Sequence, residues 1–210
     1  MVNDVIETLA GDRQRALNLL DLLDDHFKAG KLSLNLPPAK RWLPVGGSGL
    51  AVAKNCRDKR DSFLFDLVMP VIPCKVESTG LRAALGWSDV VPLGIIMRQI
   101  RELASRPAAE AADPLTQICA HLSLRPLDDG DLEALKVGLK GLDWIPTSDG
   151  DSLTSIPFAV FKDAPDLPYK KIHSGLLSQR SKQFLTRIGC HPRYVFKTRS
   201  NNLTDVEQPN

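Results

Sequence analysis

Two cysteine–histidine pairs are the first candidates for metal chemistry in this sequence. Cys119 is separated from His121 by one residue, and Cys190 is followed directly by His191. Thiolate and imidazole are good zinc ligands, but structural zinc sites usually contain closely spaced cysteines such as Cys-x-x-Cys. None of the 4 cysteines belongs to such a motif. We therefore expect no metal and no cofactor, and we expect the cysteines to be reduced thiols.

An acidic cluster, Asp128-Asp129-Gly130-Asp131 with Glu133, resembles part of a calcium-binding loop. An EF-hand loop requires a fixed spacing of oxygen ligands and a glutamate at its last position, and both are missing here. Aspartates at the start of a helix accept hydrogen bonds from free amides and favour the positive end of the helix dipole. Helix capping is therefore the preferred interpretation of this cluster.

The glycine-rich run Gly46-Gly47-Ser48-Gly49 could in principle bind a phosphate group. It lacks the Lys-Ser/Thr ending of a P-loop, and no helix follows it directly, so it is typical of a turn. The sequence also contains no Gly-x-Ser-x-Gly, His-Glu-x-x-His or Gly-x-Gly-x-x-Gly motif. We therefore predict a non-catalytic protein and assign no catalytic residue.

Basic and aromatic residues alternate near the C-terminus and could contact an acidic partner or RNA. The stretch begins with the basic residue Arg187, and its two aromatic residues are a tyrosine and a phenylalanine. A solvated chain end is the alternative, and we favour it. The candidate contact residues are Arg193, Tyr194, Phe196, Lys197 and Arg199.

Composition sets limits on the class of protein. Hydrophobic residues make up 43% of the 210 positions and charged residues 25%, which is typical of a globular domain. The net charge is only +2, so composition gives no general reason to expect nucleic-acid binding. No run reaches the roughly 18 to 20 apolar residues of a membrane span, and the first residues do not resemble a secretion signal. We expect a soluble, cytoplasmic protein, with the nucleus as an alternative.

Helical periodicity recurs along the chain. Ala16, Leu19, Leu20, Leu23 and Phe27 form one apolar stripe, which predicts a helix that ends near Gly30. Further helices are expected at 81–85, 92–104, 115–122, 130–140 and 174–188. Residues 54–62 and 105–114 are expected to be loops, and residues 197–210 a disordered tail.

Two passages of the sequence resemble each other. Each begins with a Trp-x-Pro strand and a glycine-containing turn, and each ends with a helix followed by glycine. When the two passages are aligned, the difference in residue number between matched positions is nearly constant, and Met69 aligns with Ile172 and Leu81 with Phe184. The repeat anchors are Trp42, Pro44, Gly86, Trp144, Pro146 and Gly189.

The shared positions are apolar or glycine, which is typical of a repeated scaffold. We therefore predict an α+β fold, mainly a helical repeat module with two short Trp-x-Pro β-hairpins. The predicted units are residues 1–104 and 105–196, followed by the tail 197–210.

The order of these features resembles the repeat regions of sacsin and its relatives. The resemblance rests on the Trp-x-Pro passages, on Leu85-Gly86 followed by Pro92, and on the stretch from Phe184 to Gly189. It implies a non-catalytic scaffold of a chaperone-like protein in protein quality control, with protein clients or co-chaperones as partners. It also implies that the chain is part of, or derived from, a larger protein.

The ATPase domain of that family contains an Asp-x-Gly-x-Gly box. Asp129-Gly130-Asp131 and Asp149-Gly150-Asp151 lack the second glycine, so ATP binding is not expected. Two other functions stay open: a nucleic-acid-associated module that uses the C-terminal basic and aromatic residues, and an unrecognised hydrolase. Neither nucleic acid nor a membrane is the expected partner.

Overall fold

The computed structural model describes residues 6, 12–30, 36, 39–46, 49–161 and 169–191. In these residues the fold is α+β, with helices dominating a few short strands. The helices are α2 (Arg13–Lys28), α3 (Thr79–Ala84), α4 (Leu93–Ala104), α5 (Ala108–Leu124), α6 (Asp129–Gly138) and α7 (Gln179–Arg187). The strands are β1 (Arg41–Pro44), β2 (Leu50–Val52), β3 (Ile145–Pro146), β4 (Leu153–Thr154), β5 (Ala159–Val160) and β6 (Lys170–Lys171).

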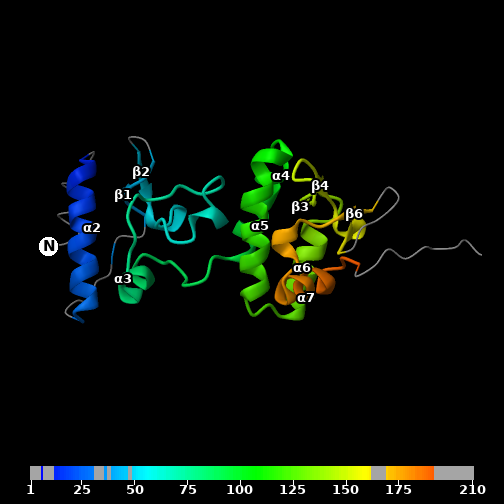
Figure 1. Cartoon of the computed structure of the whole chain (residues 1–210). Helices are drawn as coiled ribbons and strands as arrows, with labels where there is room; N and C mark the ends of the chain where they lie inside the picture. The colour runs from blue at the N-terminus through cyan, green and yellow to red at the C-terminus, as the bar shows by residue number, and fades with distance from the viewer. Residues whose placement is uncertain are drawn as a thin grey trace, which may run out of the picture.

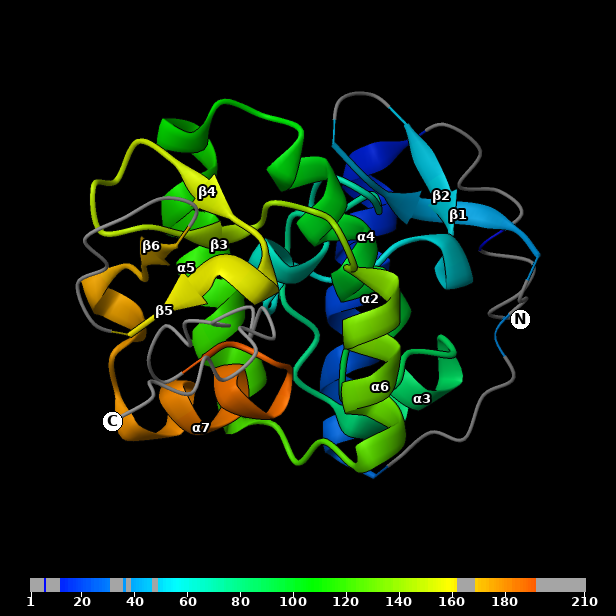
Figure 2. The same ribbon diagram turned by 90° about the vertical axis from the view of Figure 1, so that its right-hand side faces the viewer.

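The elements follow one another along the long axis of the molecule. Figure 1 shows α2 at one end, then β1, β2 and α3, then α4 and α5, and finally α6, α7 and the remaining strands. Seen along that axis in Figure 2, α6 and α7 lie in front and α2 lies behind α6. Within the described residues, every helix is too short or too polar to cross a membrane.

The strands form three separate pairs. β1 and β2 are antiparallel, with Pro44 opposite Leu50, and β3 and β4 are antiparallel, with Pro146 opposite Leu153. β5 and β6 are parallel, with Ala159 opposite Lys170. Each pair is too short to be stable alone, so packing against the helices must hold it in place.

Buried apolar side chains form two clusters, which we call the first core and the second core. The first core packs α2, the β1–β2 pair and α3 around Trp42, Leu43 and Ile72. The second core packs α4 to α7 and the later strands around Trp144 and Ile145. The predicted unit boundary between residues 104 and 105 lies inside the second core, because Ile96, Ile100 and Leu103 of α4 belong to it. The chain passes from one core to the other through Ser88, Asp89 and Val90, which are exposed.

One predicted loop is wrong, and a second is irregular as predicted but less exposed to solvent than its composition suggests. Residues 108–114 form the first turns of α5 although Pro114 lies inside the helix, because Ala111, Ala112 and Leu115 are buried in or beside the second core. In the polar segment 54–62, Arg57 and Asp58 are only 6% and 2% exposed. Their polar groups are accommodated by backbone partners: the Asp58 Oδ2 atom accepts a hydrogen bond from the Val76 amide at 2.9 Å.

Candidate functional site

The two tryptophans of the Trp-x-Pro passages occupy similar environments. Trp42 is 1% exposed in the first core and Trp144 is 0% exposed in the second core. In both, the indole Nε1 atom is buried without a hydrogen-bond partner in the described residues. Because both rings are buried in a core, neither is presented to a ligand at the surface, and both act as packing residues.

The two anchor glycines end α3 and α7. Gly86 has a φ of +76° and Gly189 a φ of +111°, a region of backbone conformation that favours glycine. The helices begin in the same way, because the side chains of Ser78 and Ser178 accept a hydrogen bond from the amide three residues later. These glycines and serines therefore fix the ends of helices.

The cysteine–histidine pairs do not form a metal site. Cys119 and Cys190 are buried thiols, and burial raises the pKa of Cys190 to about 12 and that of Cys119 further. The His121 ring packs edge-on against Phe63, with ring centroids 5.9 Å apart. No group of three or more potential ligands gathers within the part of the chain that the structure describes.

The acidic cluster caps a helix, as the sequence predicts. The Asp128 side chain accepts a hydrogen bond from the Asp131 amide at 2.7 Å, at the start of α6. Asp129 lies 3.3 Å from the Arg187 guanidinium of α7 and is fully exposed. The cluster thus stabilises α6 and faces a basic residue rather than forming a closed ligand cage.

A polar network at the β3–β4 turn brings a serine close to a lysine. The Lys170 Nζ atom donates to the Ser152 Oγ atom at 3.0 Å, and Ser152 also donates to Asp149 at 2.9 Å. A hydrogen bond from Thr147 is the main reason that the pKa of Asp149 is lowered from its ordinary value of 3.8. The Asp149 carboxylate accepts hydrogen bonds from the Thr147 and Ser152 hydroxyls and from the Asp151 amide, so it holds the turn together.

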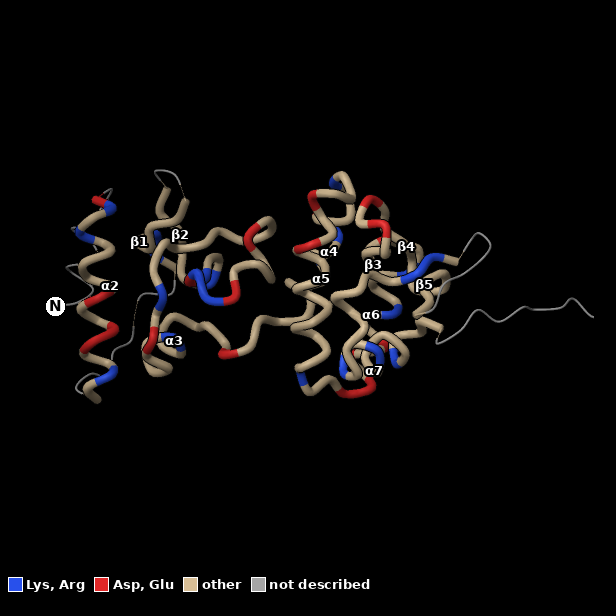
Figure 3. Tube along the Cα trace, viewed as in Figure 1, with Lys and Arg blue, Asp and Glu red and all other residues tan. Residues whose placement is uncertain are grey.

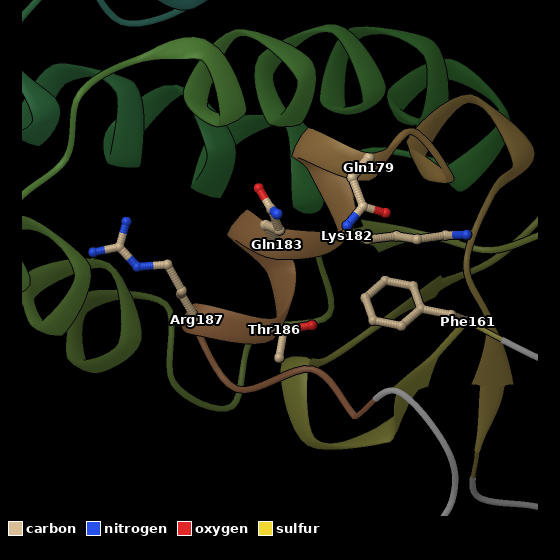
Figure 4. A pocket seen from close by; sticks show the side chains of 6 residues that line it. All are labelled: Phe161, Gln179, Lys182, Gln183, Thr186 and Arg187. Atoms are coloured by element: carbon tan, nitrogen blue, oxygen red, sulfur yellow. The ribbon is translucent and has the colours of Figure 1, made fainter.

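In the part of the chain that the structure describes, surface hollows lie beside α7, between α5 and α7, and beside the end of α6. The Phe161 hollow has a volume of about 530 Å³. Figure 4 shows its lining of Phe161, Gln179, Lys182, Gln183, Thr186 and Arg187. The Arg125 hollow, about 110 Å³, lies between α5 and α7 and includes Ser123, Arg125, Arg180, Gln183 and Arg187. The Ile156 hollow, about 370 Å³, includes Ile156, Pro157, Lys136, Lys140 and His191.

Each lining includes basic residues, and glutamines line the Phe161 and Arg125 hollows. In the described residues, none of the three hollows is lined by an aspartate or a glutamate. The predicted contact residues Arg193, Tyr194, Phe196, Lys197 and Arg199 lie outside the described residues. The sequence missed the basic face of α7, although the run of Arg180, Lys182 and Arg187 without an acidic residue between them could have indicated it.

No protein-family model matches this chain, and neither a curated protein nor a solved structure does.

Proposed function

We propose that this chain is a two-unit scaffold of the sacsin-repeat type, which binds protein clients or co-chaperones in protein quality control. The observation that supports the proposal is that two parts of the molecule share a helix, an antiparallel strand pair, a 3-10 turn and a closing helix in that order, with similar contacts between the helices and the strand pair. The first unit comprises α2, β1, β2 and α3, and the second comprises α5, β3, β4, β5, β6 and α7. Helices α4 and α6 are additions to this plan.

Matching contacts support the two-unit proposal. α2 packs against β1 and α3, and α5 packs against β3 and α7. In Figure 1, α2 and α5 both stand upright, and each has its strand pair and its short helix on the same side. A 3-10 turn follows the strand pair in both halves, at Ala53–Asn55 and at Ile156–Phe158.

The segment after the 3-10 turn also follows one pattern. Arg57 pairs with Val71 through a parallel bridge, and Val160 pairs in parallel with Lys171. The Ile72 amide donates to the Arg57 carbonyl at 2.8 Å, and the Ile172 amide donates to the Val160 carbonyl at 2.9 Å. This arrangement matches Ile172 with Ile72, whereas the sequence comparison aligns it with Met69.

The closing helices end in the same hydrogen-bond pattern. The Trp87 amide donates to the Arg82 carbonyl at 2.8 Å, and the Cys190 amide donates to the Leu185 carbonyl at 2.9 Å. Together with the positive φ of the preceding glycine, each forms a Schellman motif. α7 has 9 residues and α3 has 6, so α7 is longer than α3 by about one turn.

The features common to both units are buried rings, turns and caps. A duplicated framework of this kind supports a scaffold whose surface, rather than a reactive centre, carries function.

An aggregation assay tests the proposal. The full chain, mixed at equimolar ratio with reduced insulin, is expected to lower light scattering as the insulin B chain aggregates. An inert globular protein at the same concentration is the control. Scattering equal to that of the control would contradict the client-binding function.

A further inference from the structure

The exposed face of α7 carries two parallel stripes of polar and basic side chains. One stripe consists of Gln179, Lys182 and Thr186, and the other of Arg180, Gln183 and Arg187. Residues three and seven positions apart lie on one side of a helix, so each stripe faces a different side of the α7 ridge. The first stripe lines the Phe161 hollow, and the second lines the Arg125 hollow.

The two hollows adjoin, because Gln183 and Arg187 line both of them. Figure 4 shows the Lys182 and Arg187 side chains extending to opposite sides of α7, with the Phe161 ring turned toward the helix. The combined surface therefore offers an apolar ring on one side of the ridge and a guanidinium cluster on the other. We call it the α7 face.

Basic residues gather on α7 (Figure 3), and among the described residues their ion-pair partner is Asp129. Helix α7 contains Arg180, Lys182 and Arg187 and no acidic residue, and Arg125 adds a further cation to the lining. Arg187 has an ion pair with Asp129, but the two side chains are 52% and 103% exposed. Exposed ion pairs contribute little free energy, so an incoming carboxylate can replace Asp129 at low cost.

We propose that the α7 face binds an acidic peptide segment in which carboxylates flank an apolar side chain. The carboxylates would pair with Arg180 and Arg187, and guanidinium groups can bind carboxylates through two hydrogen bonds. The apolar side chain would enter the Phe161 hollow. This inference rests on the proposed function and names the partner chemistry of the same module.

RNA is the competing class of ligand, and the geometry disfavours it. Single-stranded RNA is held by aromatic rings that are open for base stacking. Two phenylalanines line these hollows: the Phe161 ring is turned toward α7, and Phe184 is only 5% exposed, so neither ring is open for base stacking.

Fluorescence anisotropy of the full chain with a labelled synthetic peptide tests the inference. The probe is a short peptide of alternating glutamate and leucine, and glutamine–leucine and lysine–leucine peptides and a labelled uridine-rich RNA are compared with it. We expect the glutamate–leucine peptide to bind best and to weaken as salt is added. The double variant Arg180→Glu/Arg187→Glu is expected to weaken this binding by about tenfold or more.

A matched charge reversal gives the control. Lys54→Glu/Arg106→Glu changes the net charge equally at exposed positions far from α7 in sequence, and it is expected to weaken binding less than about twofold. Arg180→Gln/Arg187→Gln repeats the test without introducing negative charge, in case the reversal unfolds α7. Equal weakening by the two charge-reversal pairs, tighter binding of RNA, or no peptide binding would each overturn the inference.

The aggregation assay separates this inference from the proposed function. If the chain suppresses insulin aggregation but does not bind the glutamate–leucine peptide, the inference fails and the scaffold function stands. If the peptide binds and aggregation is unaffected, the α7 face stands as an acidic-peptide site and the client-binding function fails.

Discussion

Asp24 is a buried acidic residue that links two helices of the first core. It is 6% exposed and accepts hydrogen bonds from the Ser78 amide at 2.7 Å and the Glu77 amide at 3.1 Å. The Lys28 Nζ atom lies 2.7 Å from the Asp24 Oδ2 atom. Burial opposes ionisation of Asp24, but Lys28 and the two amides outweigh it and lower the pKa from its ordinary value of 3.8. The carboxylate thus fastens α2 to the start of α3.

Replacing Asp24 tests this link, and Asp25 provides a matched control on the same helix. Asp24→Asn is expected to lower the free energy of unfolding by about 1–3 kcal/mol, because the amide group cannot accept both hydrogen bonds. Asp25→Asn is expected to change it by about 0.5 kcal/mol or less, since that side chain is 80% exposed. Chemical denaturation at neutral pH measures both. Equal effects would show that Asp24 does not hold the two elements together.

The stability that Asp24→Asn loses relative to the wild type is expected to depend on pH. Because the pKa of Asp24 is lower in the folded state, its stabilisation is complete above the ordinary value of 3.8 and is lost as the pH falls through the folded pKa. The difference in stability between the wild type and Asp24→Asn should therefore narrow below about pH 4. A difference that stays constant from neutral to acidic pH would contradict the lowered pKa.

At the scale of elements, the closing helices depend on their terminal glycines. A side chain in the left-handed region costs about 1–2 kcal/mol, so Gly86→Ala and Gly189→Ala should each lower the free energy of unfolding by about that amount. Gly189→Ala should cost more, because its Cβ atom would lie 3.3 Å from the Ile156 Cγ2 atom. A new Cβ atom at Gly86 would meet nothing within 4 Å.

Gly94→Ala is the control for these two variants. Gly94 lies in α4 with an ordinary φ and open space around it, so alanine should stabilise the protein by up to about 1 kcal/mol. Thermal or chemical denaturation distinguishes the opposite signs. A neutral Gly86→Ala would contradict the role of the left-handed cap in stabilising the end of α3.

How far the sequence predicts an element depends on where its stabilising contacts lie. The apolar stripe of α2 and the Asp128 cap of α6 are local patterns, and the structure confirms both. The start of α5 was missed because Pro107 and Pro114 suggest a loop, whereas distant residues of the second core bury Ala111 and hold the helix. Tertiary burial overrides local propensity there.

The same reason explains the polar side chains that the sequence did not indicate. The segment containing Arg57 has the composition of a loop, but the Arg57 and Arg82 guanidinium groups are buried and donate to the carbonyl of Ser88. The residues next to Arg57 in the sequence do not show that its partner is Ser88, which lies 31 positions away. The residues of the α7 face are also brought beside Arg125 only by the packing of α5 against α7.

At the scale of the whole molecule, the two cores are joined in two places. The first is the covalent crossing at Ser88–Val90, which Arg57 and Arg82 hold by its carbonyl groups. The second is the segment after Asp61, where Leu64 and Phe65 enter the second core. These two junctions therefore determine how firmly the first core is held against the second.

Gln99 of α4 fixes the second of these junctions. Its side chain is buried and donates to the Phe63 carbonyl at 3.2 Å and to Asp66 at 2.5 Å. It also accepts a hydrogen bond from the Leu67 amide at 3.0 Å. One amide side chain therefore uses both its donor and its acceptor groups to hold a segment of the first half against the second core.

Gln99→Leu removes these hydrogen bonds while keeping a side chain of similar size. We expect the free energy of unfolding to fall by about 1–3 kcal/mol, because the Leu67 amide loses its acceptor in a part-buried site. Since the lost contacts join the cores, native-state hydrogen exchange should accelerate more in α2 than in α5. Gln117→Leu, the same substitution at an exposed position of α5, should leave both helices unchanged. Equal acceleration in the two helices would mean that the molecule opens as one unit, and that Gln99 does not couple two separate cores.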